Sequence, residues 1–131
     1  MRPDVYFHIR EGNQRSALAI GPGKIALLEA IAETGSLTSA AKQLKMSYRR
    51  AWLLMDETNR CLVGPAVETA AGGSQGGGTK LTRVGNELVS RYRALEQEMA
   101  NVVVRQLKPV FRTSPKREHG KVKAVRKAGG R

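Results

Sequence analysis

The hydrophobic pattern at the start of the chain has a period of two. Val5, Phe7 and Ile9 alternate with polar or amphipathic neighbours, which predicts a half-buried strand. A second short apolar run, Ala17 to Ile20, follows a polar segment. We therefore expect a small antiparallel hairpin at the N-terminus.

The period then changes to three and four, which is typical of helices. Pro22 suits a first helical turn, and Gly35 stands where a helix end favours positive φ. Ser36 and Ser47 are good N-caps for two further helices. The expected helices cover about 22–34, 37–44 and 48–60. Because only a few residues separate the last two, the pattern predicts a helix-turn-helix.

The next segment is expected to form a hairpin, or wing. Two short strand patterns, Val67 to Ala70 and Thr79 to Leu81, flank the glycine-rich stretch 72–78. A long helix then starts near Thr82 and runs until Pro109. Its apolar side chains recur every three or four residues and form a stripe that needs a partner. The stripe consists of Leu88, Tyr92, Leu95, Met99 and Val102 or Val103.

Charge sharpens this picture. The 131 residues carry a formal net charge of +12, which points to a polyanionic partner. Segment 112–131 holds eight basic residues and one acid, so it contributes +7 and the rest of the chain +5. We expect one DNA-binding domain over 1–108, including a dimerisation helix over about 82–108, and a disordered basic tail over 109–131. The expected fold class is mainly α with small β-hairpins.

Several function classes are disfavoured. Cys61 is the only cysteine, and His8 and His119 lie far apart, so we expect no disulfide, zinc site or other metal site. We expect Cys61 to be a small buried thiol. Asp56 and Glu57 point about 100° apart on a helix and do not form an acid-base pair. No apolar run is long enough for a transmembrane helix, and no signal-peptide pattern is present. We therefore expect a protein of the reducing cytoplasm, with no cofactor, membrane contact or enzymatic activity.

The first turns of the third helix carry the best candidates for DNA contact. Arg49 and Arg50 could hydrogen-bond guanine in a bidentate way, whereas Lys42 and Lys45 would lie near phosphates. A lone arginine pair is usually only solvated, but the helix-turn-helix and wing favour the functional interpretation. The full set expected to contact DNA is Ser36, Thr38, Lys42, Lys45, Ser47, Tyr48, Arg49, Arg50, Lys80 and Arg83.

Two aromatic residues of this helix have two interpretations. Tyr48 and Trp52 lie one turn apart and share a face. In the interpretation that we favour, both rings pack the helix onto the hairpin, because the chain has only six aromatic residues. In the alternative, Trp52 touches the DNA backbone or a thymine methyl group.

The glycine-rich stretch does not match a nucleotide-binding loop. That motif requires Gly-Lys followed by Ser or Thr, whereas Gly78-Thr79-Lys80 has the reverse order and Gly23-Lys24 precedes Ile25. We interpret the stretch as a mobile wing tip flanked by Lys80 and Arg83.

Together these motifs resemble the N-terminal DNA-binding domain of ModE-type molybdate-responsive transcriptional regulators, which is related to the winged helix-turn-helix of LysR-type regulators. The resemblance covers about 4–96. The most specific part combines Ser-Tyr-Arg-Arg-Ala-Trp at 47–52 with two glycine clusters. The other matching segments are Gly21-Pro22-Gly23, Leu28 to Ile31, Thr34 to Leu37, Ala40-Ala41, Met46, Asn59, Pro65, Leu81-Thr82 and Gly85.

This resemblance implies a bacterial or archaeal regulator, at the prokaryotic nucleoid, that binds an operator as a homodimer through contacts of the long helix from Thr82. It also implies that segment 47–52 is the recognition segment and that Lys80 and Arg83 lie in the wing. It implies no molybdate or tungstate site here, because the family binds its oxyanion in C-terminal molbindin-like domains, which we expect this chain to lack. At one position the chain departs from the family, because Lys45 stands where glycine is common.

Three hypotheses follow. The first is a sequence-specific, dimeric transcription regulator that binds a pseudo-palindromic site, with a role in molybdate or metal homeostasis. The second is a nucleoid-associated, non-specific DNA binder dominated by the tail. The third is a DNA-binding subunit that relies on a separate oxyanion-sensing protein.

Overall fold

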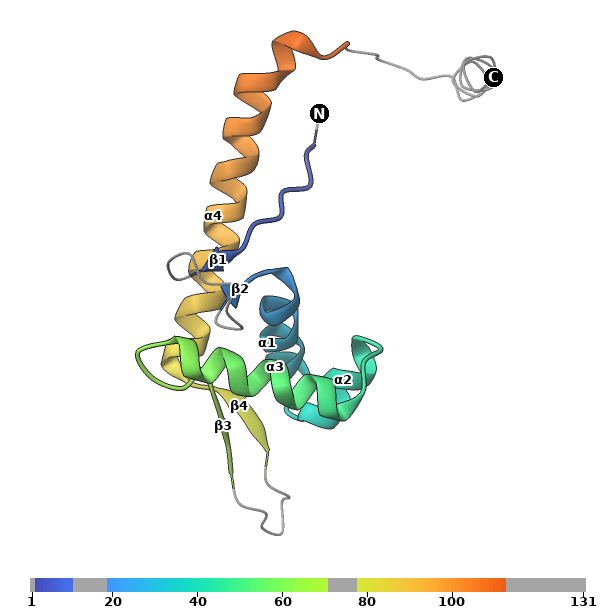
Figure 1. Ribbon diagram of the computed structural model, residues 1–131, viewed down its shortest axis with the longest axis vertical. Helices are drawn as coiled ribbons and strands as arrows, with labels where there is room; N and C mark the ends of the chain where they lie inside the picture. The colour runs from blue at the N-terminus through green and yellow to red at the C-terminus, as the bar shows by residue number, and fades with distance from the viewer. Residues whose placement is uncertain (1, 11–18, 71–77, 113–131) are drawn as a thin grey trace, which may run out of the picture.

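The computed structural model describes residues 2–10, 19–70 and 78–112, and it confirms a winged helix-turn-helix (Figure 1). Residues 72–77 of the predicted wing tip and residues 113–131 of the predicted tail over 109–131 lie outside the described residues. The first two residues of that tail, Pro109 and Val110, belong to a 3₁₀ turn and not to a disordered segment. Along the chain the elements are β1 (Ile9–Arg10), β2 (Ala19–Ile20), α1 (Pro22–Thr34), α2 (Leu37–Gln43), α3 (Tyr48–Cys61), β3 (Val67–Thr69), β4 (Thr79–Leu81), α4 (Arg83–Leu107) and the 3₁₀ turn η1 (Lys108–Val110).

The core lies where α1, α2 and α3 meet. Ile25, Leu28 and Ile31 of α1 are fully buried, and Ala40 and Ala51 allow α2 and α3 to approach closely. The predicted caps are confirmed. The Ser36 and Ser47 hydroxyl oxygens each accept a 3.0 Å hydrogen bond from a backbone N–H of the following helix, and Gly35 ends α1 with φ 74°.

The turn between α2 and α3 has the two hydrogen bonds of a Schellman motif. Met46 N donates to the Ala41 carbonyl at 3.0 Å, and Lys45 N donates to the Lys42 carbonyl at 3.0 Å. This motif requires a left-handed residue at position 45, and Lys45 has φ 57°. A lysine therefore adopts the backbone geometry for which the family commonly uses glycine.

Lys45→Gly should stabilise the protein. A left-handed backbone costs a residue with a Cβ roughly 1–2 kcal/mol, and the extra entropy of glycine in the unfolded chain cancels part of the gain. We expect a net increase of about 0.5–1 kcal/mol in the free energy of unfolding, measured by urea denaturation. Lys45→Ala is the matched control, because it removes the same exposed side chain but keeps the Cβ. Equal stability of the two variants would contradict this account.

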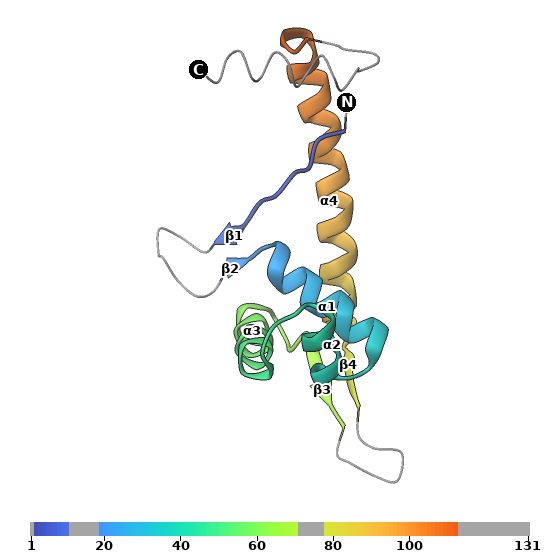
Figure 2. The same cartoon turned by 90° about the vertical axis from the view of Figure 1, so that its right-hand side faces the viewer.

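The wing is attached to the helices on both of its strands. The Asn59 side chain of α3 accepts hydrogen bonds from Ala66 N at 2.8 Å and Val67 N at 3.0 Å. On the other strand, Thr79 N donates to the Gly35 carbonyl at 3.0 Å. The hairpin is antiparallel, with Val67 opposite Leu81. These contacts set the direction in which the hairpin leaves the body of the protein (Figure 2).

The N-terminal segment packs against α4. Phe7 stacks on Tyr92 with ring centroids 4.3 Å apart, and the Tyr92 hydroxyl donates a 2.8 Å hydrogen bond to the Phe7 carbonyl. Burial raises the pKa of this hydroxyl. The predicted antiparallel pair is confirmed, although its first strand is short because only Ile9 and Arg10 pair with β2. Val5 and Phe7 are half-buried, as the alternation predicts, but Ile9 is exposed.

Helix α4 begins next to the wing and then leaves the body of the protein. The Thr82 hydroxyl caps it by accepting from Gly85 N at 3.1 Å and donates to the Pro65 carbonyl at 2.6 Å. Further along, the Arg93 guanidinium bridges Glu29 of α1 and Glu96 of α4, and its hydrogen bonds lower the pKa of Glu29. Beyond this anchor the C-terminal half of α4 projects away from the helical core (Figures 1 and 2).

Two of the sequence interpretations are wrong. Tyr48 and Trp52 do not pack α3 onto a hairpin, because both rings are exposed, and the buried face of α3 consists of Ala51, Met55 and Thr58. Cys61 is half-buried rather than buried, and its thiol donates to the Glu57 carbonyl at 3.1 Å. The inward face of α3 is thus narrow and contains no ring.

Candidate nucleic-acid interface

The N-terminal turns of α3 present cations to solvent. Ser47 caps the helix, and the Arg49 and Arg50 side chains that follow are exposed. Burial of Ala51 and Met55 fixes the rotation of α3 about its axis, so the opposite face points outward. This arrangement suits an element that enters a major groove with its first turns.

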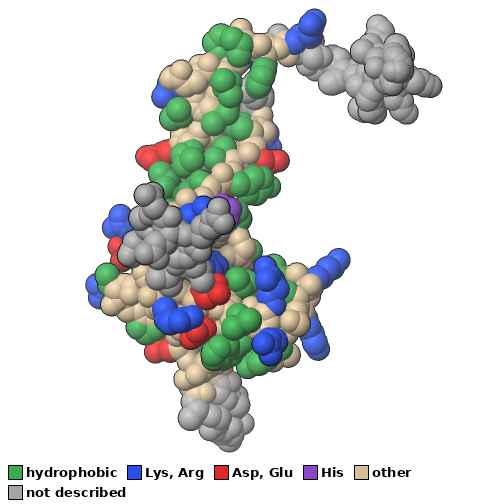
Figure 3. All heavy atoms as spheres, viewed as in Figure 1, with side chains coloured by type: hydrophobic (Ala, Val, Ile, Leu, Met, Phe, Trp, Pro, Cys, Tyr) green, Lys and Arg blue, Asp and Glu red, His purple; other side chains and the backbone are tan. Residues whose placement is uncertain are grey.

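Neighbouring polar side chains extend this surface. Lys42 of α2 and Lys45 of the turn are exposed, as is Thr38 in the first turn of α2. Ser36 is half-buried, and its hydroxyl oxygen accepts the capping bond from Ser39 N. Lysine and arginine side chains lie beside apolar ones over α2 and α3 (Figure 3). Most of the helix-turn-helix residues predicted to contact DNA are thus exposed, and they lie on α2, the turn and the first turn of α3.

The wing supplies the remaining predicted contacts. Lys80 is exposed on β4, directly across from Glu68 of β3, so an acidic group accompanies it. Arg83 is the exposed first residue of α4. Both residues lie near the base of the hairpin.

The acidic residues of α3 form ion pairs with basic side chains of this protein. Glu57 forms a 3.3 Å ion pair with Lys24 of α1, and Asp56 forms the predicted pair with Arg60 at 3.2 Å. These pairs offset the negative charge that α3 would otherwise present. The ion pair of Lys24 and the hydrogen bonds that Asn59 accepts could not be predicted from the sequence pattern, because both depend on contacts between elements.

The predicted dimer residues divide into two groups. Leu88 packs against the core and Tyr92 is covered by Phe7 of its own chain, so both side chains already make contacts within the single chain. Leu95 and Val102 are exposed, and Met99 is half-buried. The exposed apolar stripe therefore starts near Leu95 and continues toward Leu107, Val110 and Phe111.

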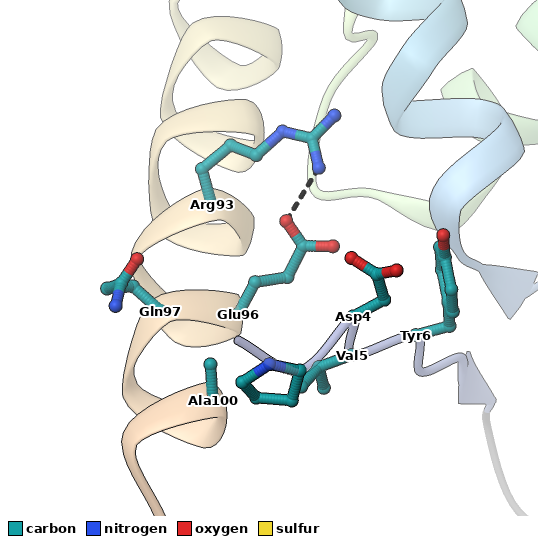
Figure 4. A pocket seen from close by; sticks show the side chains of 8 residues that line it. Asp4, Val5, Tyr6, Arg93, Glu96, Gln97 and Ala100 are labelled. Atoms are coloured by element: carbon teal, nitrogen blue, oxygen red, sulfur yellow. Dashed lines mark hydrogen bonds and ion pairs between the residues drawn. The ribbon is translucent and has the colours of Figure 1, made fainter. Parts of the chain in front are cut away.

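A cleft of about 490 Å³ lies between the N-terminal segment and α4 (Figure 4). Asp4 and Glu96 line it, and Arg93 on its wall is already bonded to Glu96. Two carboxylates beside one neutralised guanidinium disfavour an oxyanion ligand. Among the described residues, no cluster of three or more His, Cys, Asp or Glu side chains could hold a metal ion.

Known proteins are similar in sequence to the N-terminal part of this chain. The chain is 45% identical over 87 residues to the molybdenum transport protein ModE of Azotobacter vinelandii, which covers 66% of this chain and 32% of that protein. It is 42% identical over 76 residues to the DNA-binding transcriptional dual regulator ModE of Escherichia coli K12, covering 58% of this chain and 29% of that protein. Over this region the chain is a homologue of ModE-type regulators.

The ModE likeness extends to proteins with other names. The molybdenum-pterin-binding protein MopB of Rhodobacter capsulatus is 38% identical over 90 residues, or 69% of this chain and 33% of that protein. The chain spans about a third of the length of each of these ModE-like relatives. No protein-family model matches the chain. No helix in the described ranges is long and apolar enough to cross a membrane.

Proposed function

We propose that this protein is a transcription regulator that binds a pseudo-palindromic DNA operator as a homodimer, in the cytoplasm of a prokaryote. The observation that carries the proposal is the exposed basic end of α3 in a winged helix-turn-helix that is homologous to ModE. Arg49 and Arg50 would contact base edges, and Ser36, Thr38, Ser47 and Tyr48 would add contacts. Lys42, Lys45, Lys80 and Arg83 would neutralise phosphates.

The projecting half of α4 supports the dimer. A helix with an apolar stripe in solvent gains stability by covering it, and a second copy offers the same stripe. The Azotobacter vinelandii relative is a molybdenum transport protein, which supports a role in molybdate or metal homeostasis. We also propose that residues 1–108 form the DNA-binding domain, including the dimerisation helix, and that residues 109–131 form a basic tail.

Arg49→Ala should weaken operator binding by about 1–3 kcal/mol and relax the preference at one base pair, because a bidentate guanine contact is lost. The measurement is selection of bound duplexes from a random pool, followed by titration of the selected site. Repeating the selection with molybdate and tungstate tests the effector response.

Arg105→Ala is the matched control, because it also removes one exposed arginine but lies in the last turn of α4. It should change affinity by less than about two-fold, since a distant charge is screened by salt. Equal losses in both variants, or a pool that shows no preferred sequence, would contradict the proposal.

A second candidate is a non-specific, nucleoid-type DNA binder, favoured by the eight basic residues of 112–131. Removing 113–131 should then abolish most binding, whereas a specific regulator keeps its sequence preference at reduced affinity. A separate oxyanion-sensing partner is a further candidate, tested by pull-down with the full chain.

A further inference from the structure

The outward face of α3 carries two aromatic rings that the fold does not use. Tyr48 is 54% exposed and Trp52, the only tryptophan of the chain, is 44% exposed. They lie one helical turn apart, on the side of α3 between the exposed Arg49 and the buried face of the helix. Leaving large apolar surface in water is unfavourable, so these rings point to a ligand that covers them.

The surroundings of the rings identify the kind of ligand. Exposed cations lie on the same helix-turn-helix, namely Arg49 and Arg50 in the first turns of α3, Lys42 on α2 and Lys45 in the turn, while the acids Asp56 and Glu57 are engaged in ion pairs. An apolar surface of another protein would have to desolvate these charges. Duplex DNA matches the combination, because its phosphates attract the cations and its major groove offers apolar groups.

The thymine C5-methyl is the apolar group that distinguishes bases in the major groove. Residues four apart on a helix are separated by about 6 Å along its axis, and base pairs by about 3.4 Å, so two rings can cover neighbouring base steps. We propose that Tyr48 and Trp52 contact thymine methyl groups and thereby determine A·T pairs next to the position that Arg49 contacts. This inference rests on the proposed operator binding and adds a specificity determinant to it.

The test uses the full chain and the selected duplex, in which each thymine of a half-site is replaced in turn by uracil. Uracil keeps the base pair and removes only the methyl group. At one or two positions the affinity of the wild-type protein should fall about four-fold, which is the factor that burial of one methyl group contributes to binding. Wild-type protein that is indifferent to uracil at every position would overturn the inference while leaving operator binding intact.

Trp52→Ala assigns the contact. This variant should bind the thymine duplex more weakly and should no longer distinguish thymine from uracil at its position. Leu53→Ala is the control, because Leu53 is the next residue and is 43% exposed, and it should keep the discrimination. Trp52→Phe should keep part of it. Uracil sensitivity that is unchanged in both Trp52→Ala and Tyr48→Ala overturns the inference, and a chain that selects no sequence overturns the proposed function as well.

Discussion

Gly85→Ala should lower the free energy of unfolding by about 2–3 kcal/mol, the usual cost of forcing an atom into a packed site. A Cβ at position 85 would overlap with the carbonyl oxygen of Ala66 and lie 3.0 Å from its carbonyl carbon. These are backbone atoms, so no side chain can rotate away. The same carbonyl accepts a 2.9 Å hydrogen bond from Thr82 N.

Helix propensity acts in the opposite direction at this position. Alanine favours a helix over glycine by about 1 kcal/mol, so a helix considered alone would become more stable. Steric overlap with Ala66 outweighs this gain. The melting temperature should fall by roughly 10–20 °C, since a domain of this size shifts about 4–8 °C per kcal/mol.

Gly23→Ala is the matched control. Gly23 lies in the first turn of α1, and no atom lies within 4 Å of a Cβ built there. This variant should gain about 0.5–1 kcal/mol from helix propensity and from the unfolded chain. If Gly85→Ala melts at or above the wild-type temperature, the close approach of α4 to the wing does not constrain the fold.

Local signals were sufficient to predict most of the secondary structure. Caps and breakers such as Ser36, Ser47, Gly35 and Pro109 act within one or two turns of the helix ends that they define. Each predicted helix boundary therefore lies within about one residue of the observed one. The winged helix-turn-helix follows from the order of these elements.

Contacts across the fold could not be predicted in this way. The burial of Tyr92 depends on Phe7, 85 residues earlier in the chain. The hydrogen bonds between Asn59 and the start of β3 and the exposure of Trp52 likewise depend on how α3 is oriented and packed. A spacing of three and four identifies a helical stripe but does not say which part of it the protein's own chain covers.

The second large effect is expected from Leu95→Glu/Val102→Glu on α4. The two side chains are 39% and 43% exposed in the single chain, so the fold should tolerate glutamate at both positions. A proposed dimer that buries them would have to bury two carboxylates, at a cost of several kcal/mol per ion. We expect sedimentation equilibrium to show the 14.3 kDa monomer instead of the dimer.

Ser90→Glu/Asn101→Glu is the control that adds the same charge. Both residues are exposed and polar, and at about 100° per residue they lie roughly 100–140° around α4 from Leu95 and Val102, outside the apolar stripe. This variant should remain dimeric. Dissociation of both double variants would mean that added negative charge, rather than loss of the stripe, separates the subunits.

Operator affinity then tests what the dimer contributes. The affinity of a dimer that contacts two linked half-sites can exceed the affinity for one half-site by roughly 10²- to 10⁴-fold, because the second contact is intramolecular. The Leu95→Glu/Val102→Glu variant should lose affinity by this factor for the full site, yet bind an isolated half-site as well as wild type does, since α3 and the wing are untouched. Wild-type protein that sediments as a monomer, or a variant that binds the full site normally, would contradict a dimer built on α4 and leave its stripe to another partner.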